Sequence, residues 1–246
     1  MDTVLKVEGL CKKYPKFTLA DISFGMQSGR IMGLIGRNGA GKTTTIKSIL
    51  NLIHKDGGSI QYFGKDLQSC EQEIKQQIGY AAGTVDYYKK QKIRKILDIT
   101  STFYENWDEE ACRRYMQLFS LDEDKTPSEL SEGMKVKFSL VLALSHGAKL
   151  LILDEPTSGL DPISRAELLD IFTLLAKRGV SVLFSTHITS DLDKCADDIT
   201  YIKKGRLQYS GKLSDFIAQS SAAGLGDTLE DIMINSEKET FDEGLA

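Results

Sequence analysis

The segment GRNGAGKT at positions 36–43 limits the possible folds of this chain more than any other feature. It follows the apolar run IMGLI and satisfies the pattern G-x-x-x-x-G-K-[ST] of a nucleotide phosphate loop. Glycines let successive backbone N–H groups converge on phosphate oxygens, and a following helix directs its positive end at the same anion. The alternative is a plain glycine-rich turn, but the strand before it and the helix after it favour a phosphate loop in an α/β fold.

A second segment, KLLILDEPTSGLD at 149–161, supplies the acidic half of such a site. Its four apolar residues, 150–153, are typical of a central parallel strand buried on both faces. We expect Lys42 to reach the β- and γ-phosphates and the Thr43 hydroxyl to bind Mg²⁺. Asp154 is expected to hold the cation through water, and Glu155 to orient and polarise the attacking water.

Composition excludes several classes of protein. The chain has 246 residues, 41% of them hydrophobic and 27% charged, with a net charge of −4. This mild acidity argues against a dedicated nucleic-acid binder. The longest apolar region is broken by His146, Gly147 and Lys149, so we expect no segment to span a bilayer. Cysteines lie far apart and predict neither a disulfide framework nor a zinc site.

From about residue 4 to residue 213 the chain resembles the ATP-binding subunits of bacterial ABC transporters. The resemblance rests on motifs in the family's order: LCKKYPKF with Tyr14, GRNGAGKTT, LSEGM at 130–134, LLILDEP, SGLD at 158–161 and FSTHITSD with His187. In that family, the aromatic residue stacks on adenine, LSEGM matches the signature, SGLD crosses to the partner subunit and the histidine contacts the γ-phosphate. The closest type is the exporters of drugs and antimicrobial peptides.

The resemblance implies a set of site residues. Those implied to be catalytic are Glu155, His187 and Lys42, and the implied metal ligands are Thr43 and Asp154. The residues implied to bind ATP are Tyr14, Gly36, Arg37, Asn38, Gly39, Ala40, Gly41, Lys42, Thr43 and Thr44, with Ser131 and Gly133 acting on the nucleotide of a second subunit. ATP and Mg²⁺ are the implied cofactors.

The implied partners are a second ATPase subunit, in a head-to-tail homodimer or heterodimer, and separate transmembrane permease subunits. The implied location is the cytoplasmic face of the membrane, with peripheral attachment. Among alternatives, an importer subunit is the nearest. Soluble translation-factor ATPases normally carry two such cassettes in one chain, and chromosome-maintenance ATPases separate the two Walker motifs by long coiled coils, which the stretch between Lys42 and Asp154 cannot hold.

Strand and helix patterns predict a mostly parallel sheet flanked by helices, an antiparallel β portion and an inserted helical subdomain. With the resemblance, this implies an α/β fold of the ABC-type P-loop class. Segments 3–9, 17–24 and 58–63 are predicted strands of the antiparallel portion. The parallel strands are expected at IMGLIG, IGYAA, LLILD, SVLFST and DITYI. The ATPase domain is expected at 1–215 with the helical subdomain at about 86–147, and a short C-terminal tail at 216–246.

Finer expectations concern helices. Within EEACRRYMQLFSL, the spacing of Tyr115, Leu118 and Phe119 indicates an amphipathic helix. In the tail, Leu229, Ile232 and Met233 mark one short amphipathic piece.

Two positions depart from the family pattern. Gly83 stands where the family carries a glutamine that touches Mg²⁺ and the attacking water, and Thr84 and Asp86 are candidates to replace it. In the signature, Glu132 is expected to point away from the nucleotide, with Lys135 and Lys137 offsetting its field.

Overall fold

A single ten-stranded sheet forms the centre of the protein. The computed structural model describes residues 2–82 and 88–238. Its strands are β1 (Thr3–Tyr14), β2 (Phe17–Gln27), β3 (Ile31–Ile35), β4 (Gly57–Tyr62), β5 (Lys65–Asp66), β6 (Ile78–Ala82), β7 (Leu150–Asp154), β8 (Ser181–Thr186), β9 (Asp198–Lys203) and β10 (Arg206–Lys212). They are ordered β5-β4-β1-β2-β10-β9-β3-β8-β7-β6.

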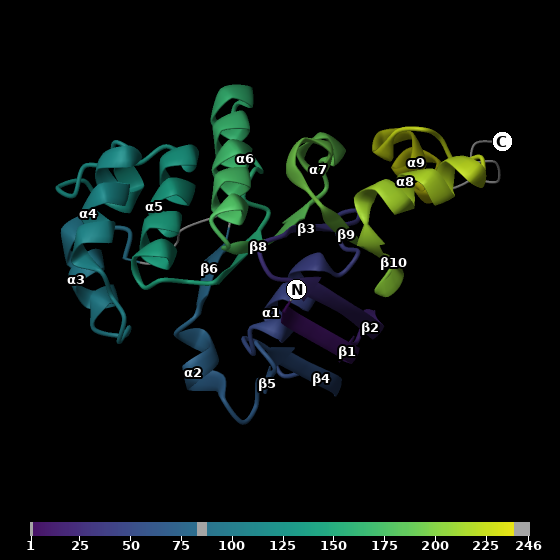
Figure 1. The fold of residues 1–246 in the computed structure, drawn as a ribbon, viewed down its shortest axis with the longest axis horizontal. Coiled ribbons are helices and arrows are strands. Elements are labelled where there is room, and N and C mark those ends of the chain that lie inside the picture. The colour runs from purple at the N-terminus through teal and green to yellow at the C-terminus, as the bar shows by residue number, and fades with distance from the viewer. Residues whose placement is uncertain (1, 83–87, 239–246) are drawn as a thin grey trace.

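Helices flank this sheet and extend it at both ends. They are α1 (Lys42–Ile49), α2 (Glu71–Lys75), α3 (Ile93–Ser101), α4 (Glu109–Leu118), α5 (Glu132–Ser145), α6 (Pro162–Lys177), α7 (Thr189–Cys195), α8 (Leu213–Ala222) and α9 (Leu229–Glu237), with a 3₁₀ turn at Pro127–Glu129. Helices α3, α4 and α5 gather at one end of the molecule and α8 and α9 at the other, with α1 and α6 on opposite sides of the sheet (Figure 1). None of the helices in the described ranges is long and apolar enough to cross a membrane.

The parallel part of the sheet consists of β9, β3, β8, β7 and β6. Every residue of β3, β7 and β8 is buried, as expected of parallel strands covered on both faces. In β2, by contrast, Ile22, Phe24 and Met26 are buried while the residues between them are exposed, the alternation of a sheet covered on one face. The predicted fold class is therefore confirmed.

Side chains of β3 show how the two faces are filled. Ile31 and Ile35 belong to one core cluster, which includes residues of α5, α6 and α7. Met32 and Leu34 point the other way and join a second cluster with residues of α1 and of the antiparallel strands. Alternation along a single strand thus anchors the phosphate loop that follows it between two separate hydrophobic cores.

The helical subdomain contains α3, α4 and α5, and no strand occurs among its described residues. Asp108 caps α4 by accepting a hydrogen bond from the Ala111 N–H at 2.8 Å. The buried face of α4 is formed by Ala111, Cys112 and Met116. Leu118, which the sequence grouped with Tyr115 and Phe119, is 68% exposed. That part of the pattern was wrong, because the packed face follows residues 112, 116 and 119.

The C-terminal part forms two helices rather than one. Phe216 of α8 packs against Tyr201 and Tyr209, with ring centroids 6.1 and 4.8 Å apart. In α9, Leu229 and Ile232 are fully buried, so the predicted amphipathic piece is confirmed as a packed helix. The boundary expected after residue 215 falls inside α8.

Candidate functional site

A cavity of about 660 Å³ lies at the carboxyl ends of β3, β7 and β8. Phosphate-loop residues line it, together with Glu155, Ser158 and His187 from the other two strand ends and Phe17 from β2. Carboxyl ends of adjacent parallel strands meet at one edge of a sheet, which is the usual ligand site of α/β folds. Its volume is in the range of small-molecule sites.

Glycines at both ends of the phosphate loop are required by geometry. Gly41 precedes α1 with φ 117°, and a Cβ there would lie 2.9 Å from a methyl carbon of Leu19 and 3.0 Å from the Phe17 ring. A Cβ on Gly36 would lie 2.2 Å from the Ile202 carbonyl oxygen. Both positions therefore admit only glycine in this conformation.

The loop is held from inside by its own lysine. The Lys42 side chain is 5% exposed, and its ammonium donates hydrogen bonds to the carbonyl oxygens of Gly36 at 2.8 Å and Arg37 at 3.4 Å. From outside, the N–H of Gly205, in the turn between β9 and β10, donates to the Ala40 carbonyl at 2.9 Å. Only glycine fits at position 205, because a Cβ there would lie 1.9 Å from the Thr18 carbonyl oxygen.

Two carboxylates follow β7. Asp154 is 9% exposed, and its Oδ1 accepts hydrogen bonds from the Thr43 hydroxyl at 3.2 Å and the Ser185 hydroxyl at 2.6 Å. Glu155 has φ 51°, a left-handed conformation that costs a non-glycine residue about 1–2 kcal/mol. Its N–H donates to the Ser185 hydroxyl oxygen at 2.9 Å, which supports this turn.

The Glu155 carboxylate lies between two nitrogen donors. Oε1 is 3.1 Å from the Lys42 ammonium, and Oε2 is 2.8 Å from Nδ1 of His187. An ionised carboxylate can only accept, so Nδ1 of His187 carries the proton in this pair. Of the residues that the sequence proposed as catalytic, Lys42 and His187 therefore each lie within hydrogen-bonding distance of Glu155.

The oxygen atoms of Thr43 and Asp154 fit a magnesium ion as ligands. Thr43 donates its proton to Asp154 and retains hydroxyl lone pairs, while Oδ2 of Asp154 accepts no hydrogen bond from the described residues. Oxygen ligands of this kind, completed by water and nucleotide phosphates, are what Mg²⁺ prefers.

Some predicted ATP-binding residues do not line this cavity. Tyr14 ends β1 with 43% of its surface exposed, and the Lys12 ammonium lies 5.6 Å from its ring centroid. The aromatic ring that does line the cavity is Phe17, which the sequence analysis missed although it stands in the same segment. Arg37, with Gly36, lines a neighbouring cavity of about 490 Å³ that reaches α9.

The signature residues lie at the start of α5 and do not line the phosphate-loop cavity of their own chain. Ser131 caps the helix, and its hydroxyl accepts a hydrogen bond from the Met134 N–H at 3.3 Å. Gly133 lies against α6, since a Cβ there would be 3.4 Å from the Ser164 Cβ.

The charges around the signature differ in part from expectation. Lys135 pairs with Glu132, with 2.6 Å between Nζ and Oε1. Lys137 instead pairs with Glu167 of α6, at 2.8 Å. The expectation that both lysines offset Glu132 was therefore wrong for Lys137, because a carboxylate on the neighbouring helix binds its ammonium.

A buried carboxylate joins two segments of the site. Asp191, fully buried in α7, accepts a hydrogen bond from the Thr157 hydroxyl at 2.6 Å and another from Thr186, beside His187, at 3.4 Å. The Arg165 guanidinium of α6 forms an ion pair with its other oxygen. The segment after Glu155 and the segment around His187 therefore share one anchor.

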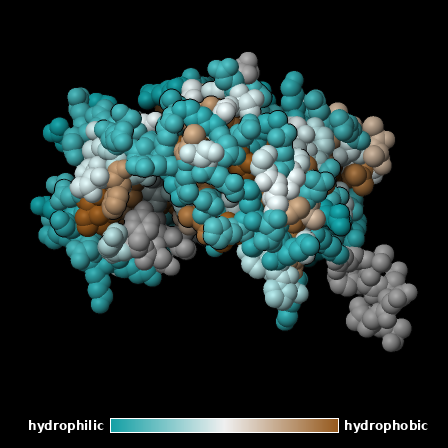
Figure 2. All heavy atoms as spheres, turned by 90° about the horizontal axis from the view of Figure 1, so that it is seen from below, coloured by the Kyte–Doolittle hydropathy of each residue, from teal (hydrophilic) through white to brown (hydrophobic). Residues whose placement is uncertain are grey.

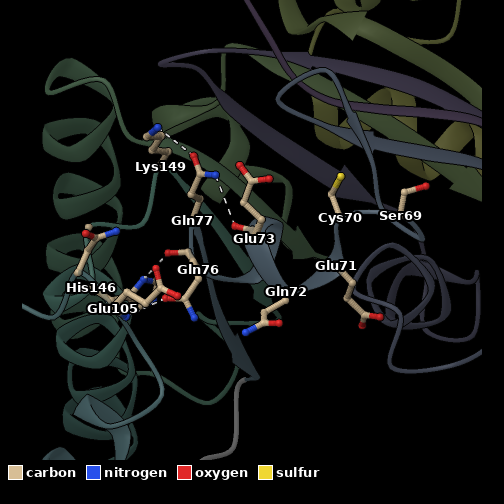
Figure 3. A pocket seen from close by; sticks show the side chains of 12 residues that line it. Ser69, Cys70, Glu71, Gln72, Glu73, Gln76, Gln77, Glu105, His146 and Lys149 are labelled. Atoms are coloured by element: carbon tan, nitrogen blue, oxygen red, sulfur yellow. Dashed lines mark hydrogen bonds between the residues drawn. The ribbon is translucent and has the colours of Figure 1, made fainter.

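A larger cavity, of about 780 Å³, lies at the opposite edge of the sheet, next to the amino ends of β6 and β7. Polar side chains of α2 and of the helical subdomain line it (Figure 3). Of the motif segments singled out in the sequence, only Lys149, at the start of KLLILDEPTSGLD, lines it, and neither the phosphate loop nor the two acids that follow β7 do, so its size alone does not make it the nucleotide site.

Three residues that support the site were not predicted from the sequence. Ser185 and Asp191 lie in FSTHITSD, in which only His187 was singled out, and Gly205 lies outside every motif. A serine inside the strand SVLFST was a usable signal for the first. Gly83, Thr84 and Asp86, considered in place of the family's glutamine, lie outside the described residues.

Comparisons with known proteins agree with this geometry. The family model described as "ABC transporter" matches residues 19–158. The chain is 34% identical over 211 residues to the "Bacitracin transport ATP-binding protein BcrA" of Bacillus licheniformis, covering 84% of this chain and 69% of that protein. It is 32% identical over 226 residues to the "Probable multidrug ABC transporter ATP-binding protein YbhF" of Escherichia coli (strain K12), covering 89% of this chain but 39% of that protein.

Among solved structures, one described as "Structure of ATP binding subunit of ABC transporter" matches with a TM-score of 0.84. Its sequence is 30% identical, and the match covers 96% of this chain and 100% of that one.

Proposed function

Because this chain belongs to the ABC transporter family, as an ATP-hydrolysing subunit of a transporter, we propose that it works as a head-to-tail dimer on separate membrane subunits and drives export of a drug, peptide or lipid. The observation that carries the catalytic part is the Glu155 carboxylate held between Lys42 and His187, next to Thr43 and Asp154. The ATPase domain we propose comprises residues 1–215.

The nucleotide is proposed to bind across the phosphate loop. Its phosphates take the N–H groups of the loop and the start of α1, where the helix dipole favours an anion. The proposed contacts are Tyr14, Gly36, Arg37, Asn38, Gly39, Ala40, Gly41, Lys42, Thr43 and Thr44. The position of Phe17 in the cavity wall supports a second aromatic contact to the nucleotide.

Thr43 and Asp154 would hold Mg²⁺, which neutralises phosphate charge when bound. Glu155 orients the attacking water, since its carboxylate is fixed at both oxygens. Lys42 supplies positive charge and, with His187, hydrogen bonds to the γ-phosphate, and this stabilises the charge that develops on its oxygens.

The dimer is supported by the position of the signature. Ser131 and Gly133 present a helix N-terminus on a surface that does not face the chain's own cavity. A second copy, or a related ATPase, would bring its nucleotide to these two residues. Closure of such a dimer depends on the γ-phosphate, so hydrolysis opens it again.

Export is favoured over import by two relatives whose names refer to bacitracin transport, for BcrA, and to a multidrug transporter, for YbhF. The site would then act from the cytoplasmic face of a membrane. Co-purification from membranes with a permease subunit, followed by ATPase assay with candidate drugs and peptides, tests this part. Stimulation by a substrate that accumulates inside the cell would favour an importer instead.

Hydrolysis itself is tested with two variants. Glu155→Gln is expected to lower kcat at least 100-fold while nucleotide binding persists, because an amide cannot replace the carboxylate that orients water. Lys42→Ala is expected to weaken nucleotide binding as well. The measurements are phosphate release and equilibrium binding of a fluorescent ATP analogue. Full activity of Glu155→Gln would contradict the assignment of the base.

A further inference from the structure

We propose that Ser185 is a positioning residue of the ATPase site, which holds the Asp154 carboxylate and the Glu155 backbone in the orientation that the cation and the attacking water require. This inference rests on the proposed function. Ser185 lies in the segment FSTHITSD, in which the sequence singled out only His187, and its role follows from its contacts.

Its place in the sheet brings Ser185 beside both acids. It lies in β8, which is buried over its whole length, and its side chain has no exposed surface. β7 and β8 are parallel, and Leu153 is in register with Phe184. The next residue along each strand is therefore Asp154 on one and Ser185 on the other, at the edge where the cavity opens.

The direction of its hydrogen bonds is determined. The Glu155 N–H donates to the Ser185 oxygen at 2.9 Å. A serine hydroxyl has a single proton, and the remaining neighbour is the carboxylate oxygen Oδ1 of Asp154, 2.6 Å away. Ser185 therefore accepts from one acidic residue and donates to the next. A hydroxyl bound to a carboxylate is a charge-assisted hydrogen bond, among the stronger kinds in proteins.

This arrangement decides which oxygen of Asp154 is left for the cation. Oδ1 takes the hydroxyls of Ser185 and Thr43, so Oδ2 remains available for magnesium or its water. Without the Ser185 hydroxyl, the Asp154 carboxylate can rotate. The Glu155 N–H then also loses its acceptor at a turn where φ is 51°. Both effects would change the positions of Asp154, which would hold the metal, and of Glu155, the base. Neither would change the contacts of the nucleotide with the phosphate loop.

The same strand offers a matched control. Ser181 begins β8, is also fully buried, and its hydroxyl accepts a hydrogen bond from the Gly29 N–H at 3.0 Å. It lies at the far end of the strand from the cavity. Ser181→Ala therefore removes a buried serine hydroxyl and its backbone bond without touching either acid.

The experiment uses the full chain and the variants Ser185→Ala, Ser185→Cys, Ser185→Thr and Ser181→Ala. Binding of a fluorescent ATP analogue is measured in EDTA and over a magnesium titration, and phosphate release is measured over the same titration. In Ser185→Ala and Ser185→Cys we expect the magnesium concentration that gives half-maximal binding or activity to rise about tenfold. The affinity for the ATP analogue measured in EDTA should be unchanged. Ser185→Thr keeps a hydroxyl at this position and should require the same magnesium concentration as the wild type. Ser181→Ala leaves Ser185 intact and should also require the wild-type magnesium concentration.

A wild-type magnesium requirement in Ser185→Ala overturns the inference, and so does an equal shift in Ser181→Ala. If Ser185→Ala does not fold, Ser185→Cys decides, because it keeps the volume and weakens both hydrogen bonds. A wild-type chain that neither binds nor hydrolyses ATP overturns the proposed function, and the role of Ser185 with it.

Discussion

At the scale of single residues, Glu132 places a negative charge beside the two small residues assigned to a second subunit's nucleotide. In the first turn of α5 the carboxylate gains about 0.3–1 kcal/mol from the helix dipole. At about 8 Å from a phosphate and an effective dielectric near 20, it would repel each phosphate charge by about 2 kcal/mol. Lys135 forms an ion pair with Glu132 and offsets part of this field. We therefore expect this signature to bind a partner's nucleotide less tightly than one without the acid.

Replacing this charge should tighten the dimer. In a Glu155→Gln background, Glu132→Gly is expected to strengthen ATP-driven dimerisation several-fold, since the repulsion is removed. Glu132→Gln is the control for charge alone and should give a similar gain without adding a flexible glycine to the helix. The measurement is the dimer dissociation constant with ATP, by sedimentation or light scattering. An unchanged constant in both variants would show that the carboxylate does not face the nucleotide.

At the scale of elements, α6 and α7 are joined through Asp191. One fully buried carboxylate binds Thr157, Thr186 and the Arg165 guanidinium. Removing one partner of a buried charge pair leaves the other uncompensated, which typically costs 3–5 kcal/mol. The segments on either side of the catalytic cavity therefore depend on each other through this residue.

Asp191→Asn should lower the free energy of unfolding by about 3 kcal/mol, because the Arg165 charge loses its counter-ion while the shape of the side chain is kept. The same substitution at Asp193, two residues along the same helix and exposed, is the matched control and should change stability by less than about 0.5 kcal/mol. Urea unfolding of the full chain measures both. Equal effects at the two positions would contradict a structural role for the buried pair.

The order of motifs and the apolar runs predicted most elements from sequence, because β3 and residues 150–153 of β7 are apolar and are followed by glycine and acid, and β8 is apolar at 182–184. Helix α8 was missed, because LSDFIAQSSA has only two large apolar residues that are buried, Leu213 and Phe216, and a third, Ile217, that is partly buried. Contacts made across the sheet were also out of reach. The Gly205 N–H supports Ala40 only once β9 lies beside β3, and no local pattern carries that information.

At the scale of the whole molecule, the helical subdomain is joined to the sheet by polar contacts around Gln76 (Figure 3). Its side-chain amide donates to the Phe103 carbonyl at 2.9 Å and accepts from the Glu105 N–H at 3.0 Å. The backbone carbonyl oxygen of Gln76 lies 3.2 Å from Nδ1 of His146. The His146 ring stacks on Tyr104, with ring centroids 3.8 Å apart. On the face seen in Figure 2, hydrophobic residues form small separate patches. Inside the protein, residues of α3, α4 and α5 share one buried core cluster with β3, β7 and β8.

Acid should weaken this junction. Burial lowers the pKa of His146, so the folded protein keeps the ring neutral at pH values where the unfolded chain binds a proton. The stability that His146 contributes is therefore present above the unfolded pKa of about 6.5 and is lost as pH falls toward the lowered value, by at most about 1.4 kcal/mol per pH unit.

Urea unfolding at pH 7.5 and pH 5.5 checks this. His146→Gln should lose less stability over that interval than the wild type. The same substitution at exposed His54 should lose as much stability between pH 7.5 and pH 5.5 as the wild type does. Parallel losses in the wild type and His146→Gln would assign the acid sensitivity to other groups.

The position of β3 between β8 and β9 has a consequence for how the chain is made. All five residues of this strand are buried, yet its two neighbours in the sheet are synthesised about 150 residues later. At about 5–20 residues per second, the strand waits roughly 8–30 s on the ribosome before either neighbour emerges. The antiparallel strands β1, β2 and β4 can pair meanwhile, because they are close in sequence. The strand that leads into the phosphate loop is thus translated well before both of its neighbours and is enclosed only after they emerge.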